Sequence, residues 1–389
     1  MTHEFTLTHT VNRPPDDVFY AFTNSPMLAE WWCDWAFLAP HRAGTYYMYW
    51  ESGFHAMGQY TAFEEPNRLA FTWSDGASPA CRAEVSFSAT DGGTRVEVTY
   101  ADIDNEDQAE QLQTHWRDGL ENLASWLEDG IDLRAARRPM LGVFIGGLAH
   151  EDEHGTPQGV NISGTLPGLS AAAAGLQAGD VLVEVDGTPL TSIEDLVGTV
   201  GSHSVGDSVS VAYMRDGTRH TAEMELKARQ LADIPREADR LADQLAAVYA
   251  EVMAELDGVL AGLTDEQAAT FTDVEEWNIR QILGHLVANE KDMQSLISMR
   301  AGGLVENSGY NNNSMIRIEP VLAFSPTVEA LRERIAQTQA ETVIAVRNLP
   351  AQFVARRGSY DRLGRDVLEE ADVHYRDHIA QIERIKAAL

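Results

Sequence analysis

Residues 366–389 read DVLEEADVHYRDHIAQIERIKAAL, and this segment decides the fold of the C-terminal part of the chain. Its apolar residues recur at helical spacing and predict an amphipathic helix with one apolar stripe. The stripe consists of Val367, Ala371, Tyr375, Ile382 and Ile385. His374 and His378 fall inside it, and buried imidazoles need partners because an unsatisfied nitrogen is costly. A divalent metal would satisfy both, since side chains four residues apart on a helix point the same way.

A second predicted helix, at 278–299, supplies a third candidate ligand. There His285 flanks another apolar stripe, made of Ile282, Leu286 and Met293. Segments 240–262 and 327–348 also carry apolar residues at helical spacing. Four helices with connections of mixed length predict an all-α four-helix bundle over residues 235–389. The polar, glycine-containing stretch 306–313 is predicted to be a loop within it.

The first 135 residues show a different pattern, in which strands dominate. Proline at 14 and 15 before two aspartates predicts a helix start, because proline is tolerated in the first turn. Turn signals separate the alternating segments that follow. Strands are predicted at 5–11, 44–50, 55–64, 68–74, 81–88 and 94–100, and helices at 14–22, 26–32 and 112–127. Strand, two helices, antiparallel meander and long helix is the order of the α+β helix-grip fold.

Residues 11–32 and 115–127 resemble the START-like SRPBCC superfamily, in its branch of activators of heat-shock chaperone ATPase. The resemblance covers residues 1–135 and implies a sheet curled round the long helix, with an apolar cavity for a small apolar ligand or a client. Ordinary core packing would use the same aromatic side chains. The candidates to line the cavity are Trp31, Trp32, Tyr46, Trp50, Phe71, Trp73 and Trp116.

Residues 136–230 change pattern again, to short strands and tight turns. Strands are predicted at 141–145, 160–165, 181–185, 208–214 and 221–226, and helices at 170–175 and 192–200. The string GLQAGDVLVEVDG at 175–187 resembles the PDZ signature of high-temperature-requirement (HtrA-type) proteases. The resemblance implies a sandwich- or barrel-like β domain that adds an extended peptide to a sheet edge.

The PDZ resemblance also implies which residues bind the peptide. Its terminal carboxylate would sit on backbone N–H groups of the loop at Leu141, Gly142 and Val143, which needs no basic side chain. An apolar C-terminal side chain is the predicted preference, and its pocket is formed by Val143, Ile145, Leu196 and Val200. A PDZ domain used only as an internal docking spacer remains the alternative. No serine-protease constellation accompanies it, so protease activity is not inferred.

Trp277-Asn278, the string ILGHL at 282–286 and the string HYRDHIAQI at 374–382 resemble the DinB-like four-helix superfamily, which includes thiol-dependent S-transferases. Its metal site is made of three histidines, and His285, His374 and His378 fill all three positions. The resemblance implies a divalent transition metal, zinc or nickel, with an open coordination position. A water or thiol bound to that metal would be activated as a nucleophile.

Composition excludes several classes of function. The chain has 389 residues with 60 acidic and 29 basic side chains, and its net charge of −31 disfavours nucleic acid and anionic membrane as partners. Cys33 and Cys81 are the only cysteines, which rules out a disulfide scaffold and a cysteine zinc site. No apolar run approaches the roughly 18 residues of a membrane span, and residues 1–10 carry no visible signal peptide. We therefore expect a soluble, cytoplasmic, multidomain protein.

Two functions fit these segments, and they differ in what the metal does. The preferred hypothesis is a multidomain binding protein with a helix-grip module, a peptide-binding PDZ domain and a metal-holding bundle. The alternative is a metal-dependent transferase, similar to thiol S-transferases, or a hydrolase acting at the three histidines. Arg280, Arg356 and Arg357 are basic candidates for its substrate cluster. A chaperone-associated adaptor is a weaker third option, because fold alone does not establish function.

Overall fold

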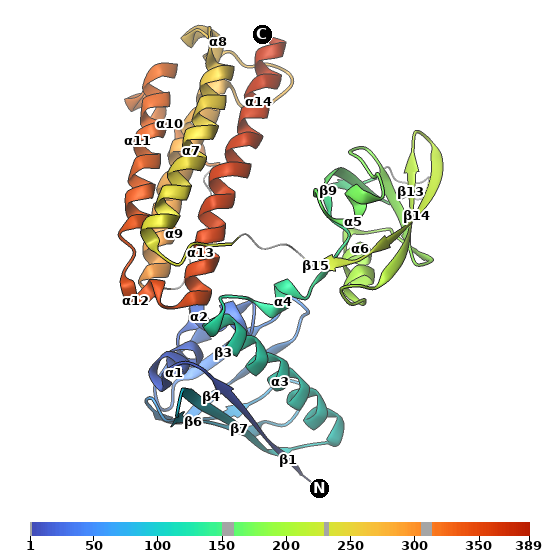
Figure 1. The fold of residues 1–389 in the computed structure, drawn as a ribbon, viewed down its shortest axis with the longest axis vertical. Coiled ribbons are helices and arrows are strands. Elements are labelled where there is room, and N and C mark those ends of the chain that lie inside the picture. Colours follow the sequence, from blue (N-terminus) through green and yellow to red (C-terminus); the bar gives the residue numbers. More distant parts are fainter. Residues whose placement is uncertain (1, 150–158, 229–232, 305–312) are drawn as a thin grey trace. The chain divides into compact units, whose positions relative to one another are not determined.

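The structure is a computed structural model that describes residues 2–149, 159–228, 233–304 and 313–389 (Figure 1). Its contacts divide the chain into two compact units. One unit contains residues 1–131 and 232–389, and the other contains residues 132–231. An N-terminal sheet domain, a PDZ-like region and a C-terminal helical domain follow one another, which confirms the mixed, multidomain fold class.

The N-terminal domain is an antiparallel sheet in the order β1-β7-β6-β5-β4-β3-β2, and the long helix α3 packs on β1 and β7. Side chains of β1 alternate between more and less exposed, so one face of the strand is directed to the core. The elements are β1 (His3–Val11), α1 (Pro15–Thr23), α2 (Ser25–Trp31), β2 (Trp35–Leu38), β3 (Thr45–Tyr49), β4 (His55–Glu64), β5 (Arg68–Trp73), β6 (Cys81–Thr90), β7 (Gly93–Ile103) and α3 (Glu106–Glu128).

Strand β2 was not predicted from the sequence. It has four residues and follows α2 after a short break, so it is too brief for its alternation to be recognised beside the tryptophan-rich helix. It forms through pairing with β3, in which Trp35 lies opposite Tyr49 and Leu38 opposite Tyr46.

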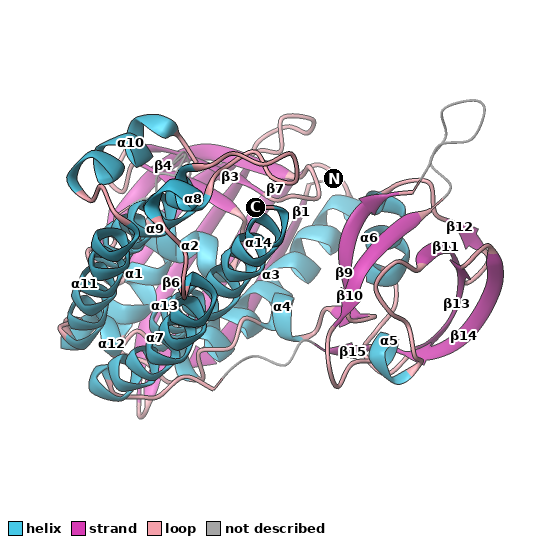
Figure 2. Cartoon of the chain, turned by 90° about the horizontal axis from the view of Figure 1, so that it is seen from above, coloured by secondary structure: helices cyan, strands magenta, loops and turns pink. Residues whose placement is uncertain are grey.

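The PDZ unit is built on a sheet in the order β14-β13-β11-β10-β9, with β12 paired to β11. Figure 2 shows β9 and β10 side by side at one edge of this sheet. The side chains of Ser192 and Asp195 form a capping box that begins helix α6. The elements are α4 (Leu133–Ala136), β8 (Pro139–Met140), β9 (Val143–Leu148), β10 (Val160–Thr165), α5 (Ser170–Ala173), β11 (Val181–Val185), β12 (Thr188–Pro189), α6 (Ile193–Gly201), β13 (Ser208–Arg215), β14 (Thr218–Glu225) and β15 (Lys227–Ala228).

The C-terminal domain is helical, and α7 packs against both α11 and α14 (Figure 1). Capping boxes begin α8 at Thr264 and α9 at Asn278. The elements are α7 (Ala238–Leu260), α8 (Asp265–Ala269), α9 (Ile279–Ala301), α10 (Met315–Phe324), α11 (Val328–Arg347), α12 (Ala351–Val354), α13 (Arg357–Glu369), the π-helical turn η1 (Glu370–His374) and α14 (Tyr375–Ala388).

Two features of this domain differ from the sequence-based expectation. The final helix begins at Arg357 rather than at residue 366, and it contains the wide turn η1 between α13 and α14. Helix α10 was not expected, and Pro320 lies inside it. The predicted loop at 306–313 lies outside the described residues except for its last position.

Candidate metal centre

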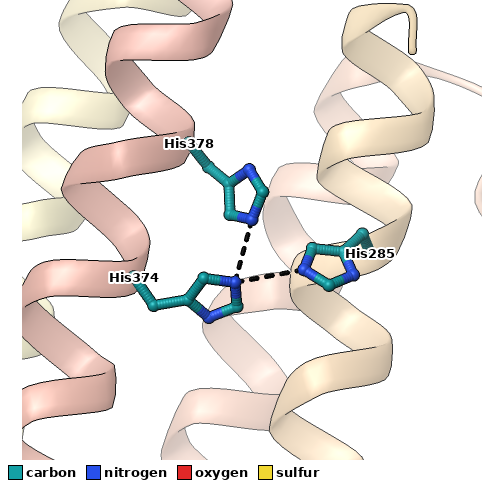
Figure 3. Close-up of side chains that lie close together, drawn as sticks. All are labelled: His285, His374 and His378. Atoms are coloured by element: carbon teal, nitrogen blue, oxygen red, sulfur yellow. Dashed lines mark hydrogen bonds between the residues drawn. The ribbon is translucent and has the colours of Figure 1, made fainter. Parts of the chain in front are cut away.

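Three histidines from two separate stretches of the helical domain meet at one point (Figure 3). His285 is on α9, His374 ends η1, and His378 is on α14. The Nε2 atom of His374 lies 3.1 Å from Nε2 of His285 and 2.8 Å from Nε2 of His378. His285 is buried, whereas the other two are half-buried. The structure therefore brings together all three predicted metal ligands.

The spacing of the nitrogens suits one ion after small side-chain rotations. A tetrahedral zinc ion with Zn–N distances of about 2.0–2.1 Å separates its nitrogen ligands by about 3.3 Å. The two Nε2–Nε2 separations from His374, 3.1 and 2.8 Å, are slightly shorter than that, and all three ligand atoms lie within 4.8 Å of one another. Three imidazoles without a thiolate are a donor set that suits zinc, nickel, copper or iron. The residues present thus fit a divalent transition metal.

Hydrogen bonds at Nδ1 of His374 and of His378 leave Nε2 of each ring available to coordinate a metal. The Nδ1 atom of His374 lies 2.5 Å from Oε1 of Glu370, and Nδ1 of His378 lies 2.9 Å from Oε1 of Gln381. Because an ionised carboxylate oxygen only accepts, we assign the ring proton of His374 to Nδ1, and we assign the same tautomer to His378 beside the amide oxygen of Gln381. The lone pair of each ring is then on Nε2, which faces the common point. The amide of Asn289 donates to the same Glu370 oxygen at 2.8 Å.

The surroundings of the site favour a neutral imidazole at His378 and an ionised carboxylate at Glu370. Burial lowers the pKa of His378, against the effect of its hydrogen bond to Gln381, so the ring stays neutral at neutral pH. Burial would raise the pKa of Glu370, but its hydrogen bonds with His374 and Asn289 hold that pKa below its usual value. A neutral ring suits a metal, because only unprotonated nitrogens coordinate, and the ionised carboxylate accepts the hydrogen bond from Nδ1 of His374.

Sequence reasoning missed Glu370 and Gln381. Glu370 is four residues before His374 and Gln381 is three residues after His378, so their helical spacing was the available signal. The ring of Trp277 also lies against the site, with its centroid 5.3 Å from that of His285.

Glu290 is on α9, the same helix as His285, and has a different environment. Its carboxylate accepts hydrogen bonds from the hydroxyls of Tyr249 at 2.9 Å, Thr342 at 2.7 Å and Tyr375 at 2.8 Å. Burial raises its pKa, although these three donors act in the opposite direction. Each buried oxygen therefore has a partner, and the cluster ties α9 to α7, α11 and α14.

Two of the three basic candidates for a substrate cluster have other contacts, whereas Nε of Arg280 is buried and has no hydrogen-bond partner within the described residues. Arg357 pairs with Asp361 at 2.9 Å and donates to the carbonyl of Ile234 at 2.7 Å. The guanidinium of Arg356 lies 4.2 Å from the ring centre of Tyr20. None of these contacts involves the histidines.

In the PDZ unit, strand β9 pairs with β10 on one side only, among the strands that the structure describes. Val143 and Ile145 lie on β9, and the Ile145 side chain is 42% exposed. Leu141, Leu196 and Val200 are buried in the core of the unit.

The backbone conformation and a close neighbour both require glycine at position 142. Its φ is +83°, and a Cβ there would lie 2.3 Å from the Cβ of Leu169. The carbonyl of Gly142 accepts a hydrogen bond from the backbone N–H of Leu166 at 2.8 Å, which holds the loop against the turn before α5.

The aromatic residues proposed to line a cavity in the N-terminal domain are buried and packed against one another. The rings of Trp32 and Trp116 are 4.2 Å apart, and Trp31 stacks on Trp32 at 5.5 Å. The space between them has a volume of about 20 Å³ and is lined by Trp32, Tyr46, Phe71 and Trp116, among others. That volume holds about one water molecule. A larger cavity lies elsewhere in the domain and shares Trp73 with the predicted set.

Three family models match the chain in sequence order. "Activator of Hsp90 ATPase homolog 1-like protein" matches residues 12–128, "PDZ domain" matches 147–226, and "Mycothiol maleylpyruvate isomerase N-terminal domain" matches 249–377. The chain is therefore a multidomain protein that joins an SRPBCC-like helix-grip domain, a PDZ domain and a DinB-like helical domain. This confirms the three resemblances drawn from the sequence.

Curated relatives match over short stretches. The Serine protease Do-like HtrA of Lactococcus lactis subsp. lactis (strain IL1403) is 38% identical over 98 residues, 23% of this chain and 24% of that protein. The Periplasmic serine endoprotease DegP of Escherichia coli (strain K12) is 29% identical over 109 residues, 28% of this chain and 23% of that protein. The chain thus spans about a quarter of the length of these relatives.

Similar solved structures cover about a third of the chain. The Aha1 dimer from Colwellia psychrerythraea has a TM-score of 0.31 at 17% identity and covers 32% of this chain and 96% of that one. CalU16 from Micromonospora echinospora has a TM-score of 0.30 at 20% identity, with 33% and 77% covered. Among the helices of the described ranges, none is long and apolar enough to cross a bilayer.

Proposed function

We propose that this chain is a multidomain binding protein whose helical domain holds one divalent transition metal, zinc or nickel, at His285, His374 and His378. One observation carries the proposal: the Nε2 atom of His374 lies 3.1 Å from that of His285 and 2.8 Å from that of His378, so the three nitrogens face one point. Glu370 and Gln381 support it, because each fixes the tautomer that leaves Nε2 unprotonated.

We assign three modules, a helix-grip domain at 1–135, a PDZ domain at 136–230 and the metal-holding bundle at 235–389. In the PDZ module, the loop at Leu141, Gly142 and Val143 receives the carboxylate of a peptide C-terminus, and the peptide adds to the free edge of β9. The helix-grip module binds a small apolar ligand or a client. A cytoplasmic location belongs to the same proposal, and fractionation of cells that make the protein tests it.

Metal analysis of protein prepared without a histidine tag tests the bundle. We expect about one transition-metal ion per chain. The double variant His374→Ala/His378→Ala should lose it, because one imidazole cannot hold the ion alone. His203→Ala/His220→Ala is the matched control, since it removes two imidazoles from the PDZ unit and should retain the metal. Metal retained by the first variant, or lost from the second, contradicts the assignment.

Peptide binding tests the middle module. Peptides with a free apolar C-terminal residue should bind, and their amidated forms should bind at least about tenfold more weakly, because backbone N–H groups bind the carboxylate. The variant Gly142→Ala should abolish the difference, since the added Cβ collides with Leu169. Equal affinity of free and amidated peptides would remove the carboxylate loop from the proposal.

A metal-dependent transferase or hydrolase is the second candidate. It is favoured by the number of ligands, because the described residues supply three histidines and catalytic metal sites keep a fourth position open. When bound, such an ion would supply Lewis-acid chemistry. Two residues of the chain would orient its ligands. Glu370 accepts a hydrogen bond from Nδ1 of His374, and Gln381 accepts one from Nδ1 of His378. Turnover that survives the loss of His374 and His378 would exclude this candidate.

A further inference from the structure

A second cavity of about 200 Å³ lies in the helix-grip domain, beside the first half of α3. Its lining includes Phe54, Trp73, Asp75, Gln108, Leu112 and His115. An apolar cavity of about 150 Å³ can hold benzene, so this cavity has room for one aromatic ring or a fused pair. A ligand site here rests on the binding role proposed above for the helix-grip module, and it is independent of the metal.

Two polar atoms on the lining residues lack partners. Nε2 of His115 and Oε1 of Gln108 are buried and have no hydrogen-bond partner within the part of the chain that the structure describes. The two residues are seven apart on α3, two helical turns, and therefore share one face. Leaving such an atom unsatisfied costs about 1–3 kcal/mol. A ligand that bonds to them would recover that cost.

Aromatic rings make the walls of the cavity and hold the imidazole in place. The ring of His115 lies 5.0 Å from Trp50, 5.4 Å from Trp32 and 5.9 Å from Phe54 between centroids. Phe54 and Trp73 line the cavity itself. A planar aromatic ligand would gain edge or offset-stacked contacts with such walls.

The charges and hydrogen-bonding groups of the cavity select among aromatic ligands. The backbone N–H groups of Ser78 and Ala77 donate to Asp75 and lower its pKa despite its partial burial, so it is a carboxylate at neutral pH. Burial lowers the pKa of His115 to about 4, so its ring is neutral. No lysine or arginine lines the cavity among the residues described. The amides of Gln108 and Gln111 are uncharged, so a ligand carboxylate would meet the negative charge of Asp75 with no lining cation to offset it. The buried oxygen of Gln108, by contrast, needs a donor.

We propose that this cavity binds a neutral or cationic aromatic molecule of one or two rings that carries an N–H or O–H donor, and that it rejects aromatic carboxylates. The donor bonds to Oε1 of Gln108, and the ring lies between Phe54 and Trp73. Nε2 of His115 accepts or donates according to its tautomer.

Calorimetric and NMR titrations of the full chain at pH 7.5 test this with phenol, indole, toluene and benzoate as probes. Phenol and indole should bind at one site and shift the amide signals of α3. Toluene, which lacks a donor, and benzoate, which is an anion, should each bind at least about tenfold more weakly, the equivalent of 1.4 kcal/mol. No saturable binding of any probe, or benzoate binding as tightly as phenol, would overturn the inference.

Variants on one helix separate recognition from folding. Gln108→Leu should bind phenol about tenfold more weakly and toluene no more weakly than the wild type does. Gln113→Leu is the matched control, because the same change is made on α3 at a residue outside the cavity lining. Phenol binding unchanged in Gln108→Leu contradicts the role of its oxygen. The metal-free double histidine variant should bind phenol normally, so failure of this inference and failure of the metal site are distinguishable.

Discussion

Replacing Glu370 by glutamine should weaken metal binding without unfolding the helical domain. The carboxylate lies 2.5 Å from Nδ1 of His374 and holds the proton there, so the lone pair of Nε2 faces the other two histidines. A neutral amide oxygen can still accept a hydrogen bond from the Nδ1–H group, but without the assistance of charge. If the amide rotates, its NH₂ group donates to Nδ1 and places the ring proton on Nε2, where it competes with the metal.

The magnitude depends on the bond and its exposure. A charge-assisted hydrogen bond is about twice as strong as a neutral one, which is worth about 1–1.5 kcal/mol here. Loss of a group that orients a metal ligand costs about 10–100-fold in affinity. The Glu370 side chain is 36% exposed, and water screens part of the effect. We therefore expect the lower end, a loss of about tenfold.

Competition with a chelator of known zinc affinity measures this loss, with circular dichroism to show that the helices remain. Glu383→Gln is the matched control, because it removes the same charge from an exposed position on α14. Wild-type affinity within twofold in Glu370→Gln would refute the reasoning. An equal loss in both variants would assign the effect to overall charge instead of the hydrogen bond.

Two further predictions concern the stability of the N-terminal domain. His115 has a pKa of about 4 in the folded protein against about 6.5 unfolded, so the unfolded chain takes up the proton first and stability is lost as pH falls from 6.5 towards 4. Urea unfolding at pH 7 and pH 4.5 measures how far the free energy of unfolding falls between these pH values. The fall should be about 2–3 kcal/mol smaller in His115→Gln than in the wild type. An equal fall in both proteins argues against a neutral buried imidazole. Gly58→Ala should destabilise the domain by about 1–3 kcal/mol or more, because its Cβ would lie 1.8 Å from the carbonyl oxygen of Thr72. Gly258→Ala, which meets no atom within 4 Å, is its control, and unfolding midpoints that fall equally would refute the steric argument.

Local spacing made the three domains and the convergence of the three histidines predictable. The histidines four apart on a stripe and the third histidine after Trp277 are local patterns, and each stays on the same helix face in the folded protein. The PDZ string at 175–187 is equally local, because its glycines and aspartates mark turns between β11 and its neighbours.

The wide turn η1 was missed, although its signal is in the sequence. Val367, Ala371, Tyr375 and Ile379 step by four residues, whereas a regular helix turns every 3.6, so the stripe would drift by about 40° at each step. The turn Glu370–His374 takes up that drift and keeps these side chains buried. Such π-helical turns are often found at functional sites.

The cavity beside α3 could not be predicted, because it depends on packing between distant segments. Phe54 follows β3, Asp75 follows β5, and Gln108 lies on α3, so three-dimensional closure alone brings them together. The helix-grip resemblance did indicate Trp73 but not Phe54, because a sequence does not decide which aromatic rings pack against each other and which border a space.

Trp277 gives the helical domain an optical reporter of its own. The chain has eight tryptophans, and the other seven all lie within residues 31–126. The indole of Trp277 lies 5.3 Å from the ring of His285. Nickel, with an open d shell, quenches indole fluorescence at short range, whereas zinc has a filled shell and does not. The fluorescence of Trp277 is the difference between the emission of the wild type and that of Trp277→Phe. Nickel should quench this fluorescence and zinc should not, so that fluorescence distinguishes the two candidate ions in solution.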